Sequence, residues 1–257
     1  MTDAPELVHY EVDRAIATVT LDSPTNRNAL SAQLVGELTA HLQTAAADDT
    51  VRAVVLTHTG RVFCAGADLK EQSSEGGPQA GTQRMLGLLR AIVEAPKPVV
   101  ARVDGAVRAG GVGLVGACDI ALAGAASSFA FTEVRLGLAP AIISLTTLGR
   151  MTERAVSRYY LTGETFGAAA AAAAGLVTAA PDDLEAELGT VLDALRACSP
   201  QGLAETKPLT TRSTLAAFDA RARDMQSLSA RLFGSEEARE GMLAFLEKRP
   251  PRWSADE

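Results

Sequence analysis

The chain has little cysteine. Its 257 residues include Cys64, Cys118 and Cys198, which are far apart in the sequence and form no CxxC pair. So few and so scattered cysteines exclude a disulfide framework and argue against a cysteine-based zinc site. A reducing compartment fits this pattern best.

Histidine is equally scarce. His9, His41 and His58 lie far apart, and the chain contains neither an HExxH motif nor a GxSxG motif. The sequence therefore gives no support for a zinc protease or for a hydrolase built on a nucleophile elbow.

Basic residues and long apolar runs are also lacking. Asp and Glu outnumber Lys and Arg by 31 to 24, so a nucleic-acid partner, which needs a basic surface, is not expected. The most apolar stretch, residues 112–126, contains Asp119 and is shorter than the ~20 residues that a membrane helix needs. The N-terminus carries Asp3 and Glu6 and lacks the features of a signal peptide. We expect a cytoplasmic protein without a membrane or nucleic-acid partner.

What the sequence does contain is an alternation of strand and helix patterns. Strand patterns occur in residues 9–21, 51–57 and 98–103, and helical patterns follow Ser31 and cover residues 82–93. Because 47% of the residues are apolar, the chain can bury a large core. This pattern predicts an α/β fold.

The second half of the chain is mostly helical in pattern. The expected helices are residues 152–160, 168–174, 182–197, 214–232 and 236–246. We therefore divide the chain into an α/β core, residues 1–195, and a C-terminal helical region, residues 196–257.

Two segments rich in small residues are candidates for chemistry. Residues 61–70 and 97–120 both contain turns with glycine or alanine that follow apolar strands. Small residues let a ligand approach the backbone, and free N–H groups at such turns can donate to a developing negative charge. Two facing turns would form an oxyanion hole.

A second interpretation of the same region is dinucleotide binding. Gly111, Gly113 and Gly116 form a GxGxxG pattern after a strand, with Glu133 about twenty residues further on. A lone GxGxxG is weak evidence, and this one lies in mid-chain after an α/β segment that a nicotinamide-binding fold leaves unexplained.

The sequence resembles the enoyl-CoA hydratase/isomerase (crotonase) family over nearly its whole length. One segment that carries the resemblance is Phe63-Cys-Ala-Gly-Ala-Asp-Leu-Lys70. The others, in the family's order, are residues 28–30, 97–105, 117–120, 129–140, 162–164, 174–177 and 240–249. Many short signals in one order are far more specific than any single motif.

The resemblance implies a crotonase-type (ClpP/crotonase-like) spiral of ββα units with a C-terminal helical trimerisation region. It also implies an acyl-CoA thioester substrate, no cofactor apart from the coenzyme A of that substrate, no metal, and a homotrimer or a hexamer made of two trimers. The backbone N–H groups of Ala67 and Gly110 would form the oxyanion hole.

Two glutamates are typical of family members that hydrate a double bond, and this sequence matches only one of them. Glu133 falls on the later position and Gly113 on the earlier one. Hydration divides two proton transfers between two carboxylates, whereas shifting a double bond needs one carboxylate that moves a proton from C2 to C4. Glu133 is the expected acid/base, with a pKa raised by apolar neighbours. We also expect Gly113 to leave space for a bulkier acyl group or a water.

The remaining site residues are carried over from the family by position. The expected substrate and coenzyme A contacts are Ala65, Asp68, Leu69, Lys70, Gly111, Gly113, Phe245 and Lys248. Residues 71–84, rich in Gly, Ser and Gln, are expected to form a mobile loop near the acyl pocket.

The same oxyanion hole would serve more than one function. Decarboxylation or dehalogenation also passes through an enolate, so either is an alternative on this scaffold. A non-catalytic acyl-CoA binder, in which the missing carboxylate at Gly113 has removed turnover, is another.

Overall fold

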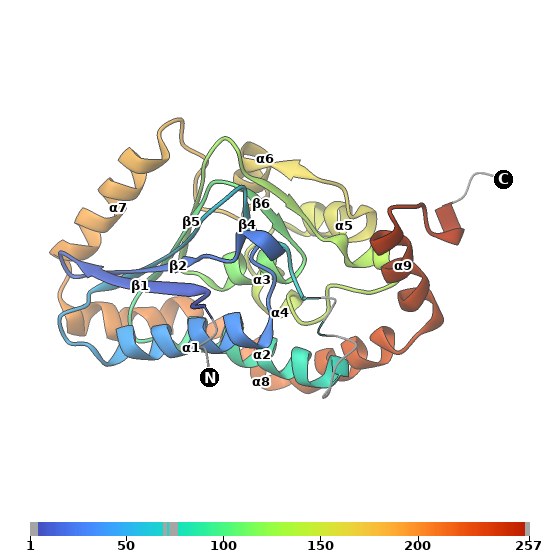
Figure 1. Ribbon diagram of the computed structural model, residues 1–257. Coiled ribbons are helices and arrows are strands. Elements are labelled where there is room, and N and C mark those ends of the chain that lie inside the picture. The colour runs from blue at the N-terminus through green and yellow to red at the C-terminus, as the bar shows by residue number, and fades with distance from the viewer. Residues whose placement is uncertain (1–4, 69–70, 72–76, 255–257) are drawn as a thin grey trace.

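The computed structural model describes residues 5–68, 71 and 77–254, and the α/β core is built on two sheets (Figure 1). The first sheet contains five strands, and its first pair is antiparallel while the others are parallel. In spatial order these strands are β1 (Val8–Asp13), β2 (Ile16–Leu21), β3 (Ala53–His58), β5 (Val99–Val103) and β7 (Ile120–Ala123).

The second sheet contains four short strands and is parallel except for its last pair. In spatial order they are β4 (Val62–Cys64), β6 (Ala106–Arg108), β8 (Ser128–Ala130) and β9 (Phe166–Gly167). From β3 onward, a strand of the first sheet is followed each time by one of the second sheet and then by a helix. The repeating units are β3-β4-α2, β5-β6-α3 and β7-β8-η3. This is the predicted spiral of ββα units.

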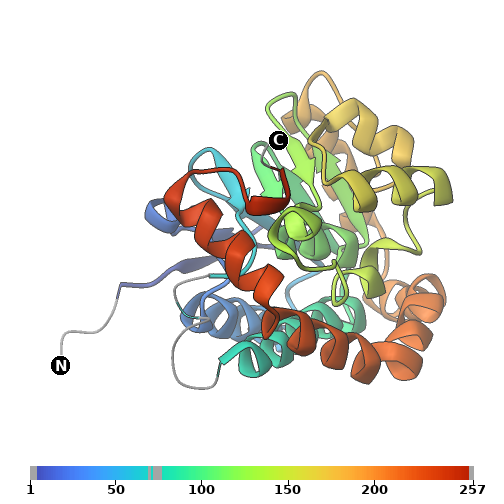
Figure 2. The ribbon, with the colours of Figure 1, turned by 90° about the vertical axis from the view of Figure 1, so that its right-hand side faces the viewer.

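Helices cover both faces of the five-stranded sheet. On one face α2 (Gly77–Glu94) lies between α1 (Ala32–Ala47) and α8 (Pro200–Phe233), as Figures 1 and 2 show. The opposite face is covered by α7 (Leu184–Ala197), whose Leu184 packs in a separate apolar cluster. Alternate strand residues therefore enter two different cores.

The remaining helices follow strands of the core or belong to the C-terminal region. They are η1 (Pro24–Asn26), α3 (Gly110–Ala117), η3 (Thr132–Leu136), α4 (Ser144–Thr147), α5 (Glu153–Thr162), α6 (Ala168–Ala174), α9 (Glu236–Glu247) and η4 (Arg252–Ser254). No helix in the described part of the chain is long and apolar enough to cross a membrane.

Two helices are longer than the sequence pattern predicts. Helix α2 begins at Gly77 where residues 71–84 were expected to be a loop, although residues 72–76 lie outside the described part of the chain. Helix α8 begins at Pro200 instead of residue 214, because Ser199 caps it and proline is well suited to a first helical position. The loop prediction is thus wrong for residues 77–84.

A buried ion pair fixes α8 to the core. The Nζ of Lys207 lies 2.8 Å from Oδ2 of Asp119 and donates to the carbonyls of Ile92 and Lys97 at 2.9 and 3.0 Å. The Lys207 side chain is only 4% exposed. Burial lowers the pKa of Lys207, and Asp119 opposes that change.

Removing one member of this pair is expected to be costly. Lys207→Met leaves the Asp119 carboxylate largely buried without its cation, so we expect a loss of about 3–5 kcal/mol in the free energy of unfolding. Denaturant titration measures this loss. The matched control is Arg90→Met, which removes an exposed pair with Asp219 of α8 and is expected to cost at most about 1 kcal/mol. Equal losses in the two variants would contradict the prediction.

Candidate active site

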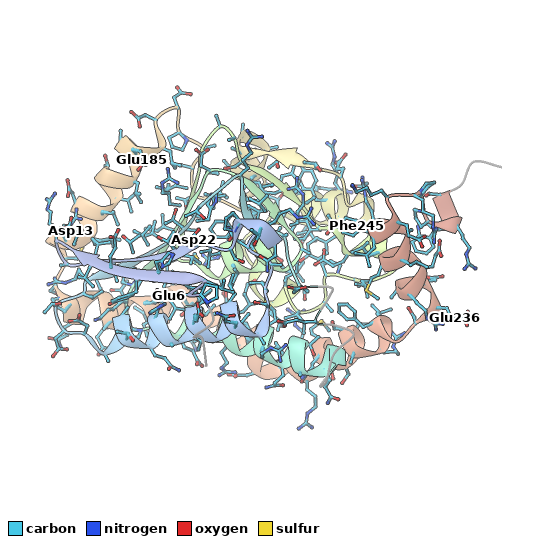
Figure 3. The ribbon with its side chains drawn as sticks, viewed as in Figure 1. Glu6, Asp13, Asp22, Glu185, Glu236 and Phe245 are labelled. Atoms are coloured by element: carbon cyan, nitrogen blue, oxygen red, sulfur yellow. The ribbon has the colours of Figure 1, made fainter. Side chains whose placement is uncertain are left out.

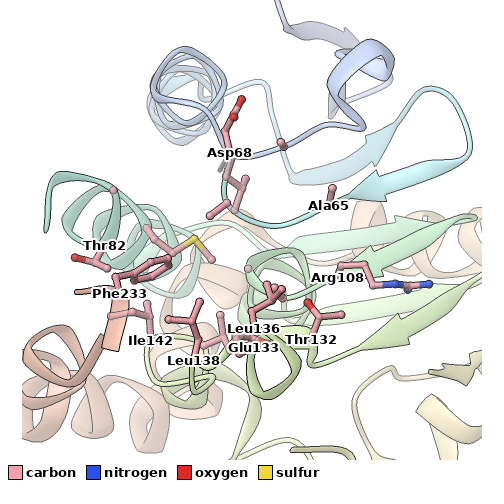
Figure 4. Close-up of a pocket in the computed structure, with 18 of the residues that line it drawn as sticks. Ala65, Asp68, Thr82, Arg108, Thr132, Glu133, Leu136, Leu138, Ile142 and Phe233 are labelled. Carbon is pink, nitrogen blue, oxygen red and sulfur yellow. The ribbon is translucent and has the colours of Figure 1, made fainter. Parts of the chain in front are cut away.

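One cavity of about 700 Å³ lies between the turn after β4, helix α2, the η3 and α4 region, and the ends of α8 and α9. Ala67 and Gly110 line it, and so does Glu133. Figure 4 shows Glu133, Leu136 and Leu138 on one wall and Asp68 on the opposite wall. Residues from three predicted positions, far apart in the sequence, therefore share one cavity.

The first turn, residues 65–67, is held by the segment after η1. The Asn28 side chain is buried, accepts the N–H of Ser23 at 2.7 Å and donates to the Val62 carbonyl at 2.8 Å. Leu30 donates its N–H to the Gly66 carbonyl at 2.8 Å. Outside helices and strands, the Ala67 N–H donates to no carbonyl of the described residues. Since Ala67 lines the cavity, its N–H is a candidate donor to a ligand there.

The second turn lies directly against the first. Gly110 is the first residue of α3, so its N–H has no acceptor within the helix. A Cβ placed on Gly66 would lie 3.4 Å from the Gly110 nitrogen and 2.9 Å from the Ala109 Cβ. Gly66 itself has φ +91°, and Ala109 has φ +46°. Strained backbone of this kind is typical of functional turns.

The two turns thus bring two residues whose backbone N–H groups lack an acceptor in the described part of the chain to the lining of one cavity. The N–H groups of Ala67 and Gly110 belong to adjacent turns, and the positive end of α3 lies at Gly110. An oxygen that develops negative charge in the cavity would be stabilised by both donors and by the helix.

Glu133 is half-buried, and one oxygen of its carboxyl group, Oε2, is fully buried without a partner among the described residues. Burial raises the pKa of Glu133 to about 7, and a backbone hydrogen bond within the residue opposes this shift. The neighbouring Phe131 is fully buried and Leu136 lines the cavity. A carboxyl group with a pKa near neutrality can both accept and release a proton.

The C-terminal region packs directly on the element that carries Glu133. A Cβ on Gly241 of α9 would lie 2.6 Å from the Leu136 carbonyl carbon and oxygen, and one on Gly137 would lie 2.6 Å from the Glu237 carbonyl carbon. Helix α9 is therefore in close contact with η3, as Figure 2 illustrates. The last helix therefore packs against the C-terminal end of the element that carries Glu133.

Three of the predicted substrate contacts line the cavity. These are Ala65, Asp68 and Phe245, the last of which lies on α9 at the end of the molecule opposite Asp13 (Figure 3). Leu69 and Lys70 fall outside the described residues.

The other predicted contacts lie away from the cavity wall. Of the described residues, Gly111 and Gly113 do not border the cavity, and Lys248 is exposed at the end of α9. A Cβ on Gly113 would lie 2.5 Å from Cγ2 of Ile143. The expected space for a bulkier acyl group or a water beside Gly113 is therefore absent, because Ile143 fills it.

The glycines of α3 serve close packing against protein atoms. A Cβ on Gly111 would lie 2.8 Å from the Cys64 carbonyl oxygen, and one on Gly116 would lie 2.8 Å from Cγ2 of Thr147. This face of α3 leaves no room for a pyrophosphate. The GxGxxG pattern is thus explained by packing, and the dinucleotide interpretation loses its basis.

Several cavity residues were not predicted from the sequence. Helix α2 contributes Thr82, Arg84 and Met85, and α8 contributes Ser229 and Phe233. No sequence signal distinguishes these residues from other residues of a helix. The sequence predicts only that residues 71–84 lie near the acyl pocket, and Thr82 and Arg84 of that range line the cavity.

Fold and site together define an α/β protein of the crotonase type, in which backbone donors and a half-buried carboxyl group share a cavity. The sequence model described as enoyl-CoA hydratase/isomerase matches residues 11–256. The chain belongs to the enoyl-CoA hydratase/isomerase family, and an acyl-CoA substrate is implied by that membership.

Solved structures and curated relatives agree with this assignment. An enoyl-CoA hydratase from Mycobacterium avium is 52% identical, with a TM-score of 0.91 and coverage of 98% of this chain and 100% of that chain. An enoyl-CoA hydratase from Mycobacterium smegmatis is 32% identical, with a TM-score of 0.76 and coverage of 97% and 99%. The mitochondrial enoyl-CoA hydratase domain-containing protein 3 of Danio rerio is 32% identical, over 98% of this chain and 89% of the relative.

Proposed function

We propose that this protein is an enoyl-CoA isomerase that shifts a double bond of an acyl-CoA thioester through an enolate. The observation that carries the proposal is the carboxyl group of Glu133, whose Oε2 is buried and unpaired among the described residues, in the cavity that Ala67 and Gly110 also line. Position 113, where family hydratases typically carry a second glutamate, is a glycine.

The chemistry needs one base and one oxyanion hole. Ionised Glu133 takes a proton from C2 of a 3-enoyl thioester, and the electron pair moves to the thioester oxygen. The N–H groups of Ala67 and Gly110 donate to that oxygen while it is negative. Protonated Glu133 then returns the proton at C4, and the double bond forms between C2 and C3. No atom is gained or lost, so no co-reactant is required.

Two further carboxylates line the cavity but are placed differently. Asp68 lies on the wall opposite Glu133, and its carboxylate points away from Glu133 in Figure 4. Oε2 of Glu71 accepts the N–H of Ala32 at 2.8 Å and lies 3.9 Å from Arg84. We therefore assign proton transfer to Glu133 alone.

Hydration of a 2-enoyl thioester is the second candidate. The names of the relatives favour it, because all three are called enoyl-CoA hydratases or contain that domain. In a hydratase of this chain, Glu133 would have to serve both proton transfers through one water. Decarboxylation, dehalogenation and binding without turnover stay open alternatives.

Product analysis of the purified protein separates these functions. A 3-enoyl-CoA and a 2-enoyl-CoA are each incubated with the protein, and double-bond position and water addition are followed by NMR or mass spectrometry. We expect the 3-enoyl substrate to be converted to the 2-enoyl product with little hydration. Rapid hydration of the 2-enoyl substrate would overturn the isomerase, and binding without any turnover would favour the non-catalytic binder.

The pH profile of the reaction tests the role of Glu133. Only the ionised carboxylate takes the C2 proton, so protonation removes activity as the pH falls through the raised pKa of about 7. We expect kcat/KM to rise roughly tenfold per pH unit below that pKa and to level off above it. The test is a set of initial-rate measurements between about pH 5 and about pH 9. A loss of activity centred near the ordinary glutamate pKa of 4.5 would contradict this assignment.

Two expectations from the family resemblance belong to this proposal. The reaction as written uses carboxylate and backbone groups, so we expect no cofactor or metal requirement beyond the coenzyme A of the substrate. We also propose that residues 196–257 mediate assembly into a homotrimer or a hexamer, which sedimentation velocity would test.

A further inference from the structure

We propose that Ile143 determines the reaction specificity of this site, because its side chain fills the volume beside Gly113 that a second carboxylate or a hydrating water would need. The inference rests on the proposed isomerase function and identifies the residue that keeps the site to one carboxylate. It is carried by the contact between Gly113 of α3 and the residue that precedes α4.

The contact between the two residues leaves no room for a side chain at position 113. A Cβ on Gly113 would lie 2.5 Å from Cγ2 and 2.9 Å from Cβ of Ile143, and 3.3 Å from Cε of Met85. The Met85 methyl group is the end of a flexible side chain and can move. The Cβ of Ile143 is fixed to the backbone, so relief of this clash requires the segment before α4 to shift.

Hydrogen bonds hold that segment in place. The Ile143 carbonyl accepts the N–H groups of Thr146 and Thr147, each at 3.1 Å, and the Thr147 hydroxyl at 2.7 Å. The Thr146 hydroxyl donates to the Gly113 carbonyl at 3.0 Å. Helices α3 and α4 are thus tied together at the point of contact, and Ile143 is only 3% exposed. The segment that contains Ile143 is therefore held close to position 113.

The chemical consequence follows from the apolar nature of this wall. Ile143 lines the cavity and closes the space beside Gly113, and Met85 lines the cavity on the same side. A held water needs about two to four polar partners, which these side chains do not provide. In hydration the water oxygen bonds to C3, its proton goes to a base, and C2 receives a proton. Without a bound water beside Gly113, hydration is disfavoured. The proton that Glu133 removes from C2 of a 3-enoyl thioester then returns at C4, which completes isomerisation.

Thermal unfolding tests the steric part of the proposal with conservative variants. Gly→Ala inside a helix ordinarily stabilises it, and Gly87→Ala in α2, where no atom lies within 4 Å of the new Cβ, is the control that should raise the Tm. We expect Gly113→Ala to lower the Tm. The loss should be smaller when Gly113→Ala is introduced into an Ile143→Ala background. A Gly113→Ala variant that gains stability like the control would overturn the proposal.

Activity tests the chemical part. The double variant Gly113→Glu, Ile143→Gly has the larger side chain at position 113 and none at position 143. We expect this variant to hydrate a 2-enoyl-CoA about tenfold or more faster than the wild type. Gly113→Glu alone should give no such gain. Equal hydration by the single and double variants, or a folded double variant without any gain, would overturn the proposal. If the double variant does not fold, the Tm values of Gly113→Ala and Gly87→Ala test the proposal in its place.

The readouts separate this proposal from the isomerase itself. Isomerisation of 3-enoyl-CoA by the wild-type protein tests the isomerase, whereas the gain in hydration and the Tm differences test Ile143. A wild type without isomerisation, beside a double variant that hydrates, would overturn only the isomerase. Rapid hydration by the wild type would overturn both.

Discussion

Glu133→Gln is expected to lower kcat for the isomerisation of 3-enoyl-CoA by about 10³-fold or more, within the range that general acid–base groups contribute. The amide has nearly the same shape as the carboxyl group but cannot accept the C2 proton. Because the change leaves the oxyanion donors in place, binding of the thioester should change little. Initial rates together with the Kd of a non-reactive acyl-CoA measure both quantities.

Two companion variants make this result interpretable. Glu133→Asp keeps a carboxylate but withdraws it from the cavity, so its rate should lie between those of the wild type and Glu133→Gln. Glu185→Gln changes an exposed carboxylate on α7, which does not line the cavity and which Figure 3 shows at the other end of the molecule from Phe245, and should leave the rate unchanged. If Glu133→Gln kept more than about one tenth of the wild-type rate, another group would have to move the proton.

The repeating part of the fold could be predicted because its signals are local. The strands β3 and β5 are short apolar runs, and each is bounded by turn residues, so the alternation of strand and helix is readable there without any tertiary contact, whereas β7 was not predicted. The helix cap at Ser31 was equally readable, and its side chain accepts the N–H of Leu34 at 3.2 Å.

The length of α8 could not be predicted, because its first half contains residues that usually end helices. Pro200, Gly202 and Pro208 all lie within the helix. Pro200 is favourable at the first position, but Pro208 removes a backbone hydrogen bond inside the helix. The buried ion pair between Lys207 and Asp119 ties the helix to the core at that point, and the sequence pattern shows nothing of it.

The site, like the fold, could be predicted only in part from the sequence. The turn at Ala67, the turn at Gly110 and the carboxyl group of Glu133 were recognisable from motifs, and the structure brings them to one cavity. Ile143 was not recognisable, because its importance lies in a contact with Gly113, thirty residues earlier in the chain. The absence of a side chain at Gly113 suggested an empty space, but Ile143 packs into that space.

Gly110→Pro is expected to lower kcat by about 10²–10³-fold, the usual effect of removing one oxyanion-hole donor. The donor is a backbone N–H, so no ordinary side-chain substitution removes it, but proline does. Gly110 is the first residue of α3, where proline is tolerated because no intrahelical hydrogen bond is lost. The rate with 3-enoyl-CoA is measured beside the Tm, which shows whether α3 still forms.

Gly110→Ala is the matched control for this variant, because it adds bulk and keeps the N–H. Its Cβ would lie 2.9 Å from Cδ1 of Leu30, the end of a flexible side chain, so a small adjustment relieves the contact. We expect Gly110→Ala to lose less than about tenfold in kcat, well short of the loss from a missing donor. Equal losses in the two variants would show that bulk at this turn, and not the N–H, limits the rate. A much larger loss for proline would show that the negative charge develops on an oxygen beside Gly110, as enolate formation requires.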